Sequence, residues 1–183
     1  MEGVMKMLAA GENPNSKLRD GLTPLMAAAN SGHASIVRIL LEHGADPNAT
    51  NDHGRNALMM AAGMRRPAVV KTLLEHDADS HARNISRLEP FAGWTALMHA
   101  AASGDLESLR MLISRSVDPN AQNANGETAL MKAIQAGHTP LVETLLKAGA
   151  DPHLQNVDGM TALDIADELG QIRIGELLRP TTL

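Results

Sequence analysis

The stretch DGLTPLMAA at residues 20–28 returns four more times along the chain in altered form. Each copy is built around one of five glycines, which are spaced by 33, 39, 33 and 33 residues: Gly21, Gly54, Gly93, Gly126 and Gly159. A period of this length indicates similar supersecondary units stacked in a row, because one unit alone cannot bury its apolar side chains. The sequence therefore predicts an elongated array rather than a domain around one central core.

One unit, residues 20–50, carries the signals of two short helices. Gly21 favours a turn, Thr23 suits the residue that caps a helix, and Pro24 suits the first helical position. A second helix is predicted over about residues 35–43, where apolar side chains fall on one face. Helices this short are marginal alone, so their stability must come from stacking on neighbouring units.

This phrase, repeated five times in phase, resembles the ankyrin-repeat family over nearly the whole chain. In that family each repeat is a helix-turn-helix with a β-hairpin-like finger, and the stack is an all-α solenoid. The fingers and first helices line a concave surface that binds other proteins. The resemblance implies a single domain, 1–183, with these parts: a half repeat at 1–19, repeats at about 20–52, 53–84, 85–124 and 125–157, and a C-terminal cap at 158–180.

The chain departs from the family pattern at two recurring positions. Where the family usually has a histidine after T-P-L, this chain has four methionines and one aspartate: Met26, Met59, Met98, Met131 and Asp164. We expect the methionines to fill the core, because their flexible side chains fit irregular gaps. The glycine that ends the second helix is replaced by Asp77 and by Ser116, which we expect to be weaker helix stops.

The 39-residue interval contains six extra residues, which we place in a longer finger near residues 85–91. The two aromatic residues of the chain, Phe91 and Trp94, lie beside this loop. Trp94 directly follows the turn glycine, a partner-facing position in the family, so we expect its side chain to be exposed. For Phe91 two interpretations stay open: it folds back onto its own repeat, or it contacts a partner.

The composition argues against several classes of protein. A net charge of −5 with two aromatic residues argues against nucleic-acid binding. The absence of cysteine excludes a disulfide framework and a cysteine-based zinc site. No apolar run is long enough to cross a membrane, and the first residues lack the pattern of a signal peptide. We therefore expect a monomeric, cytoplasmic protein, with the nucleus as an open alternative.

The polar residues do not form a catalytic constellation. Aspartates recur with the repeat, and we interpret them as turn residues that accept backbone hydrogen bonds: Asp46, Asp79, Asp118 and Asp151. A catalytic group should be unique in the chain, and these are not. There is no phosphate-binding loop, nucleophile elbow or zinc-protease motif. We predict no enzyme activity, no catalytic residues, no cofactor and no metal site.

The resemblance therefore implies a protein–protein interaction module, a scaffold or adaptor that binds on its concave surface. We expect contact to centre on residues 53–157 and to use the residues after the turn glycines, the end of one first helix, and the long finger. The predicted protein-binding residues are Leu22, Arg55, Met64, Arg65, Arg66, Arg83, Arg87, Phe91, Trp94, Glu127 and Met160.

The charge distribution suggests the chemistry of the partner. Residues 55–115 carry a net charge of +2, and the remainder of the chain carries −7. We expect another protein whose segment has an apolar anchor and acidic flanks. The alternative is a regulatory ankyrin domain excised from a larger multidomain protein, because residues 1–19 match only the second helix of a repeat.

Overall fold

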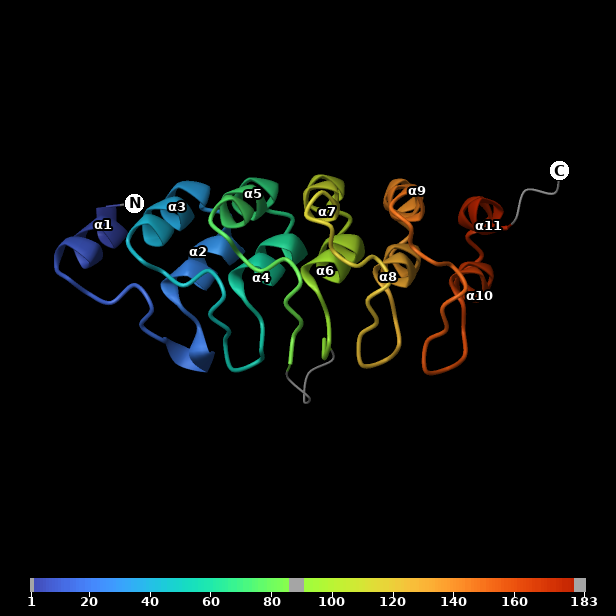
Figure 1. The fold of residues 1–183 in the computed structure, drawn as a ribbon, viewed down its shortest axis with the longest axis horizontal. Coiled ribbons are helices and arrows are strands. Elements are labelled where there is room, and N and C mark those ends of the chain that lie inside the picture. The colour runs from blue at the N-terminus through green and yellow to red at the C-terminus, as the bar shows by residue number, and fades with distance from the viewer. Residues whose placement is uncertain (1, 86–90, 180–183) are drawn as a thin grey trace.

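The structure is a computed structural model that describes residues 2–85 and 91–179, with residues 2–4 as backbone only. Within these ranges the chain forms eleven α-helices and no strand, with one isolated β-bridge between Arg83 and Thr95. Figure 1 shows two rows of helices with the connecting loops projecting to one side. The prediction of an all-α solenoid of stacked helix-turn-helix units is confirmed.

Each row of helices forms one layer of the stack. The inner row, next to the loops, holds α2 (Pro24–Ser31), α4 (Ala57–Gly63), α6 (Ala96–Ser103), α8 (Ala129–Gln135) and α10 (Ala162–Glu168). The outer row holds α1 (Glu2–Ala9), α3 (Ala34–Glu42), α5 (Pro67–Glu75), α7 (Leu106–Ile113), α9 (Thr139–Lys147) and α11 (Ile172–Leu178). A short 3-10 helix, η1 (Arg19–Gly21), lies in the first loop. Each inner helix packs against its inner neighbours and against the outer helix that follows it.

A capping side chain begins every inner helix. Its oxygen accepts a hydrogen bond from the backbone N–H three residues later, as predicted for Thr23; the capping residues are Thr23, Asn56, Thr95, Thr128 and Thr161. In α10 the carboxylate of Asp164 also accepts from the Thr161 backbone N–H at 2.8 Å, which completes a capping box. The Thr161 hydroxyl donates to the same carboxylate at 2.6 Å, and this hydrogen bond, followed by the one from the backbone N–H, lowers the pKa of Asp164. The aspartate that breaks the methionine column therefore stabilises the start of the last inner helix.

The methionine column lies in the core, as predicted. Met26, Met59, Met98 and Met131 are each no more than 1% exposed. They pack among alanines and leucines of the inner helices, where small residues let neighbouring helices approach closely. The flexible thioether chains fill the remaining space in a core with few aromatic rings.

Asparagines link the exit turns of successive repeats. The side-chain oxygen of Asn15 accepts from the Asp46 backbone N–H at 2.8 Å, and the same contact recurs from Asn48 to Asp79 and from Asn120 to Asp151. All four recurring aspartates accept a backbone hydrogen bond two residues later, so their interpretation as turn residues is confirmed. His81 stands where the ladder would have another asparagine. There the Arg83 guanidinium donates to the Gln122 carbonyl at 2.8 Å and joins the two repeats.

The two replaced helix stops keep the geometry of glycine. Asp77 and Ser116 have φ angles of 59° and 56°, close to the left-handed conformation of Gly44 and Gly149 at the equivalent positions. A side chain in this conformation costs roughly 1–2 kcal/mol. The chain therefore ends α5 and α7 in the usual way, at the expense of local backbone strain.

Candidate functional site

The turns between repeats determine which side chain reaches the inner helices. In the turn before α4, the Asn51 side-chain oxygen accepts hydrogen bonds from the backbone N–H groups of His53 and Arg55, at 3.1 and 2.8 Å. Asn123 and Asn156 make the same pair of contacts in later turns. This turn holds the residue after the glycine beside the inner row, which places Arg55 at the edge of a hollow.

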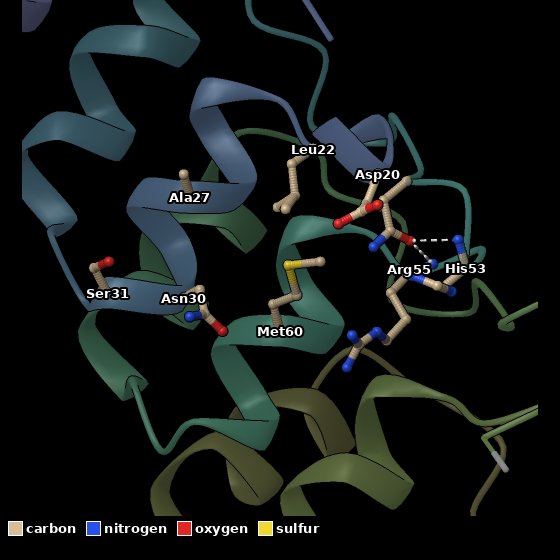
Figure 2. A pocket seen from close by; sticks show the side chains of 9 residues that line it. Asp20, Leu22, Ala27, Asn30, Ser31, His53, Arg55 and Met60 are labelled. Atoms are coloured by element: carbon tan, nitrogen blue, oxygen red, sulfur yellow. Dashed lines mark hydrogen bonds between the residues drawn. The ribbon is translucent and has the colours of Figure 1, made fainter. Parts of the chain in front are cut away.

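The first hollow lies between α2, α4 and the first two loops and has a volume of about 380 Å³. Its wall combines apolar and polar side chains: Asp20, Leu22, Ala27, Asn30, Ser31, Asn51, His53, Arg55 and Met60. Figure 2 shows Leu22 and Met60 extending towards one another, with Arg55 on the loop side. The predicted binding residues Leu22 and Arg55 therefore face the same hollow.

A second hollow of about 250 Å³ lies between α4, α6 and the loop before α6. Its lining is more apolar: Asn30, Arg55, Met59, Met60, Gly63, Met64, Phe91, Trp94, His99, Ala102 and Ser103. The two hollows share Asn30, Arg55 and Met60, so they adjoin. We refer to both together as the inner groove.

Aromatic rings form the wall of the second hollow at the α6 side. The rings of Phe91 and Trp94 meet edge to face with centroids 4.9 Å apart, and the His99 ring lies 5.0 Å from Trp94. Cations flank the rings on both sides: Arg55 lies 5.9 Å from the centre of Phe91, and Lys132 lies 4.9 Å from the centre of Trp94. Such contacts are typical of cation–π attraction. The cluster therefore joins three successive repeats of the array.

The expectation that Trp94 is exposed is wrong. Its side chain is only 7% exposed, because Phe91, His99 and Lys132 surround it. Phe91 is half-buried and packs against the core, so it folds back onto its own repeat while still lining the second hollow. Trp94 thus belongs to the wall of the groove rather than projecting towards solvent.

Three buried nitrogen atoms at this wall have no hydrogen-bond partner in the described part of the chain: Arg55 Nε, Trp94 Nε1 and His99 Nε2. Leaving a buried donor unpaired costs about 1–3 kcal/mol, so such groups are rare in native proteins. Burial, and then repulsion by Arg55, lower the pKa of His99 from 6.5 to about 4. His99 is therefore neutral at physiological pH and leaves Arg55 as the charged group at the hollow.

The carboxylate of Glu127, another predicted binding residue, is bound by side chains of α8 and of its own turn. It forms an ion pair with Lys132 and accepts hydrogen bonds from Asn123 and Gln135, both at 2.9 Å. Burial alone would raise the pKa of Glu127, but these hydrogen bonds outweigh it and lower the pKa. Its side chain holds the repeat together and fills the inner face beyond Trp94.

The remaining predicted residues divide into two groups. Met64 is half exposed at the end of α4 and lines the second hollow, and the exposed Arg65 and Arg66 follow it directly. Arg66 reaches back towards the Asn30 carbonyl, with Nε at 3.4 Å. Arg83 is tied to the Gln122 carbonyl away from the groove, and Met160 lies in the last turn. Arg87 lies outside the described residues.

Sequence reasoning missed the contribution of the inner helices to the groove. Met60 and His99 hold equivalent positions, one residue after the methionine column, and Ala27 is their counterpart in α2. All three line the groove. The repeat period could have identified these positions. Each directly follows a buried methionine on a short inner helix, so its side chain is expected at the edge of the core.

Within residues 2–85 and 91–179 no three or more histidine, aspartate or glutamate side chains come together in a way that would hold a metal ion. In the same part of the chain, no helix has the length and apolar character needed to cross a membrane.

Comparison with known proteins agrees with the geometry. A family model described as ankyrin repeats in three copies matches residues 1–84 and 97–181. A second model, described as ankyrin repeats in many copies, matches residues 64–113. No curated protein matches the chain. Ankyrin repeats are in general protein–protein interaction modules and are generally not enzymes.

Proposed function

Because the chain belongs to the ankyrin-repeat family, we propose that it is an adaptor or scaffold that binds a segment of another protein in the inner groove. The observation that carries this proposal is the groove itself, two adjoining hollows with Arg55 and Met60 at their junction. Segments of partner proteins are commonly bound in grooves with an apolar lining.

The lining favours a partner segment with an apolar anchor and acidic flanks. Met60, Met64 and Phe91 offer apolar surface in the second hollow. The Arg55 guanidinium has no ion pair within the described residues, and the exposed Arg65 and Arg66 add positive charge at the end of α4. The charges would speed encounter with an acidic segment, and the apolar contacts would supply most of the affinity.

The contact that we propose lies nearer the N-terminus than the sequence suggested. It spans residues 20–103, whereas Arg83 and Met160 lie outside it and Glu127 is engaged with Lys132. The residues proposed to line the binding site are therefore Leu22, Arg55, Met64, Phe91 and Trp94, with Met60 and His99 added. Arg65 and Arg66 stay in the proposal as exposed charges beside Met64. A cytoplasmic location remains part of the proposal, and the absence of cysteine agrees with it.

Site-specific photocrosslinking in cells of the native host tests this function. A photoreactive amino acid replaces either Ala27, exposed in the groove, or Arg38, exposed on the outer helix α3. We expect a discrete protein adduct from position 27 and none from position 38. Met64→Glu should abolish the adduct, whereas the matched change Ile172→Glu, on exposed α11, should not. An adduct from position 38 alone, or one from position 27 that Met64→Glu leaves unchanged, would contradict the proposal.

A further inference from the structure

The unpaired donors identified above gather at one place. Arg55, Trp94 and His99 all line the second hollow, and each has a buried nitrogen without a hydrogen-bond partner in the described ranges. Trp94 and His99 are 7% and 8% exposed, so water has little access to them. Arg55 Nε and Trp94 Nε1 are always donors, and the Nε2 of neutral His99 donates in one of its two tautomers. Because native proteins rarely leave buried polar atoms unpaired, their concentration at a single hollow points to a ligand that brings an acceptor.

The charge at the hollow indicates the kind of acceptor. Lys132, the next cation along the inner face, is already paired with Glu127. Arg55 has no such carboxylate within the described residues, and its guanidinium lies against the ring of Phe91. A guanidinium binds a carboxylate more strongly than a neutral acceptor, through charge-assisted hydrogen bonds. A carboxylate is therefore the acceptor that fits.

The rest of the lining is mostly apolar and would fit an aliphatic group of the ligand. Met59, Met60, Met64 and Ala102 form the apolar part of the wall. The volume of about 250 Å³ is below the roughly 300–1,000 Å³ of sites for drug-sized ligands. The hollow therefore suits a single residue that carries both an aliphatic side chain and a carboxylate, which describes the C-terminal residue of a peptide.

Residues of the following repeat lie next to the second hollow. Beyond α6 the inner face is filled by Lys132, which covers Trp94, and by Glu127 with its hydrogen-bond partners. No residue of α8 lines the second hollow. In the other direction the hollow adjoins the first hollow at Arg55 and Met60. A chain lying along the first hollow would thus meet the unpaired donors where the groove ends.

We propose that the second hollow of the inner groove is a subsite for the C-terminal residue of the partner protein. Its aliphatic side chain lies among the methionines, and its free carboxylate lies beside Arg55. This inference rests on the proposed function, since it names the partner chemistry of the same groove. The three nitrogens are covered in the structure, so binding requires rotamer changes, which the flexible Met60 and Met64 side chains permit.

Peptide selection with two matched libraries tests the subsite. One library displays random heptapeptides with a free C-terminus, and the other displays the same peptides followed by a fixed Gly-Ser tail. Selected peptides are synthesised as free acids and as C-terminal amides. Their binding to the full chain is followed by the fluorescence of Trp94, the single tryptophan and a wall residue of the hollow.

We expect the free-end library to yield peptides with an aliphatic last residue, and their amides to bind about 10- to 100-fold more weakly, as for hydrogen bonds to a charged group. Arg55→Gln should weaken binding of the acids far more than binding of the amides, which removes most of the difference in affinity between them. The matched change Arg38→Gln on α3 should have no effect. Circular dichroism checks the fold. If Arg55→Gln unfolds, Arg55→Lys is used in its place. This variant should reduce the ratio of acid affinity to amide affinity but keep it above one.

Two results would overturn the inference while the proposed function stands. One is equal affinity of acid and amide, with binding lost in Met64→Glu. The other is an acid–amide gap that Arg55→Gln leaves intact, since the carboxylate would then bind elsewhere. If neither library yields a peptide whose binding depends on Met64, the terminal subsite and the proposed function both fail.

Discussion

Acidification tests the environment of His99 quantitatively. The folded chain holds the pKa of His99 at about 4, because the ring is buried on α6 and Arg55 repels its charge, whereas the ordinary value is 6.5. Between these values the unfolded chain binds a proton that the folded chain does not. The contribution of neutral His99 to the free energy of unfolding is therefore fully present above pH 6.5 and is lost as the pH falls towards 4. The slope is about 1.4 kcal/mol per pH unit, so the loss across the window is about 3 kcal/mol.

The variant His99→Met isolates this effect, because Met60 holds the equivalent position in α4. Urea denaturation of both proteins between pH 7.5 and 4 gives two stability profiles, and groups common to both cancel in the difference. The wild type should lose about 3 kcal/mol relative to the variant between pH 6.5 and 4. The exposed His153, changed to methionine, is the control and should follow the wild type. Parallel profiles for wild type and His99→Met would refute the burial of His99 beside Arg55.

Three further changes test the packing, each by urea denaturation. Trp94→Ala removes a side chain that is 7% exposed, and should lower the free energy of unfolding by about 3–5 kcal/mol; a loss under about 1 kcal/mol would mean that the ring is exposed. Ser116→Gly should raise the free energy of unfolding by about 1 kcal/mol, because φ at Ser116 is 56° and glycine adopts this angle without strain. Ser114→Gly, at a φ of −63°, is the control and should lower the free energy of unfolding by roughly 0.5–1 kcal/mol. A loss of stability in Ser116→Gly with a gain in Ser114→Gly would contradict backbone strain at the end of α7. Glu127→Ala removes the acceptor of three side chains and should cost about 1–3 kcal/mol, whereas a neutral result would show that this network adds nothing.

The features that depended on neighbours within a repeat were readable from the sequence. Thr23 and Pro24 start α2 because a cap and a fixed φ angle act over a few residues. The methionine column is buried because its position recurs with the period. Because the motif at residues 20–28 recurs along the chain, the local structure of one unit predicts the stacked architecture of the whole array.

The groove depended on contacts between repeats, which local reasoning could not supply. The resemblance implied a partner-facing position for Trp94, yet Lys132 from the following repeat covers its ring. His99 carried no motif, and its significance comes from its burial beside Arg55, a residue of the preceding repeat. These pairs are about 40 residues apart in the sequence, so only the stacking brings them together.

The central claim, that a partner segment lies in the inner groove, is tested most directly by methyl NMR of the methionines. The chain has 11 methionines, and each can be labelled at its methyl group with carbon-13. Those in the described residues include members of both rows of helices. On addition of the crosslinked partner segment or a selected peptide, the signals of Met60 and Met64 should shift, and that of Met111 on the outer helix α7 should not. A shift of Met111 with Met60 and Met64 unchanged would place the partner on the outer helices and contradict the account.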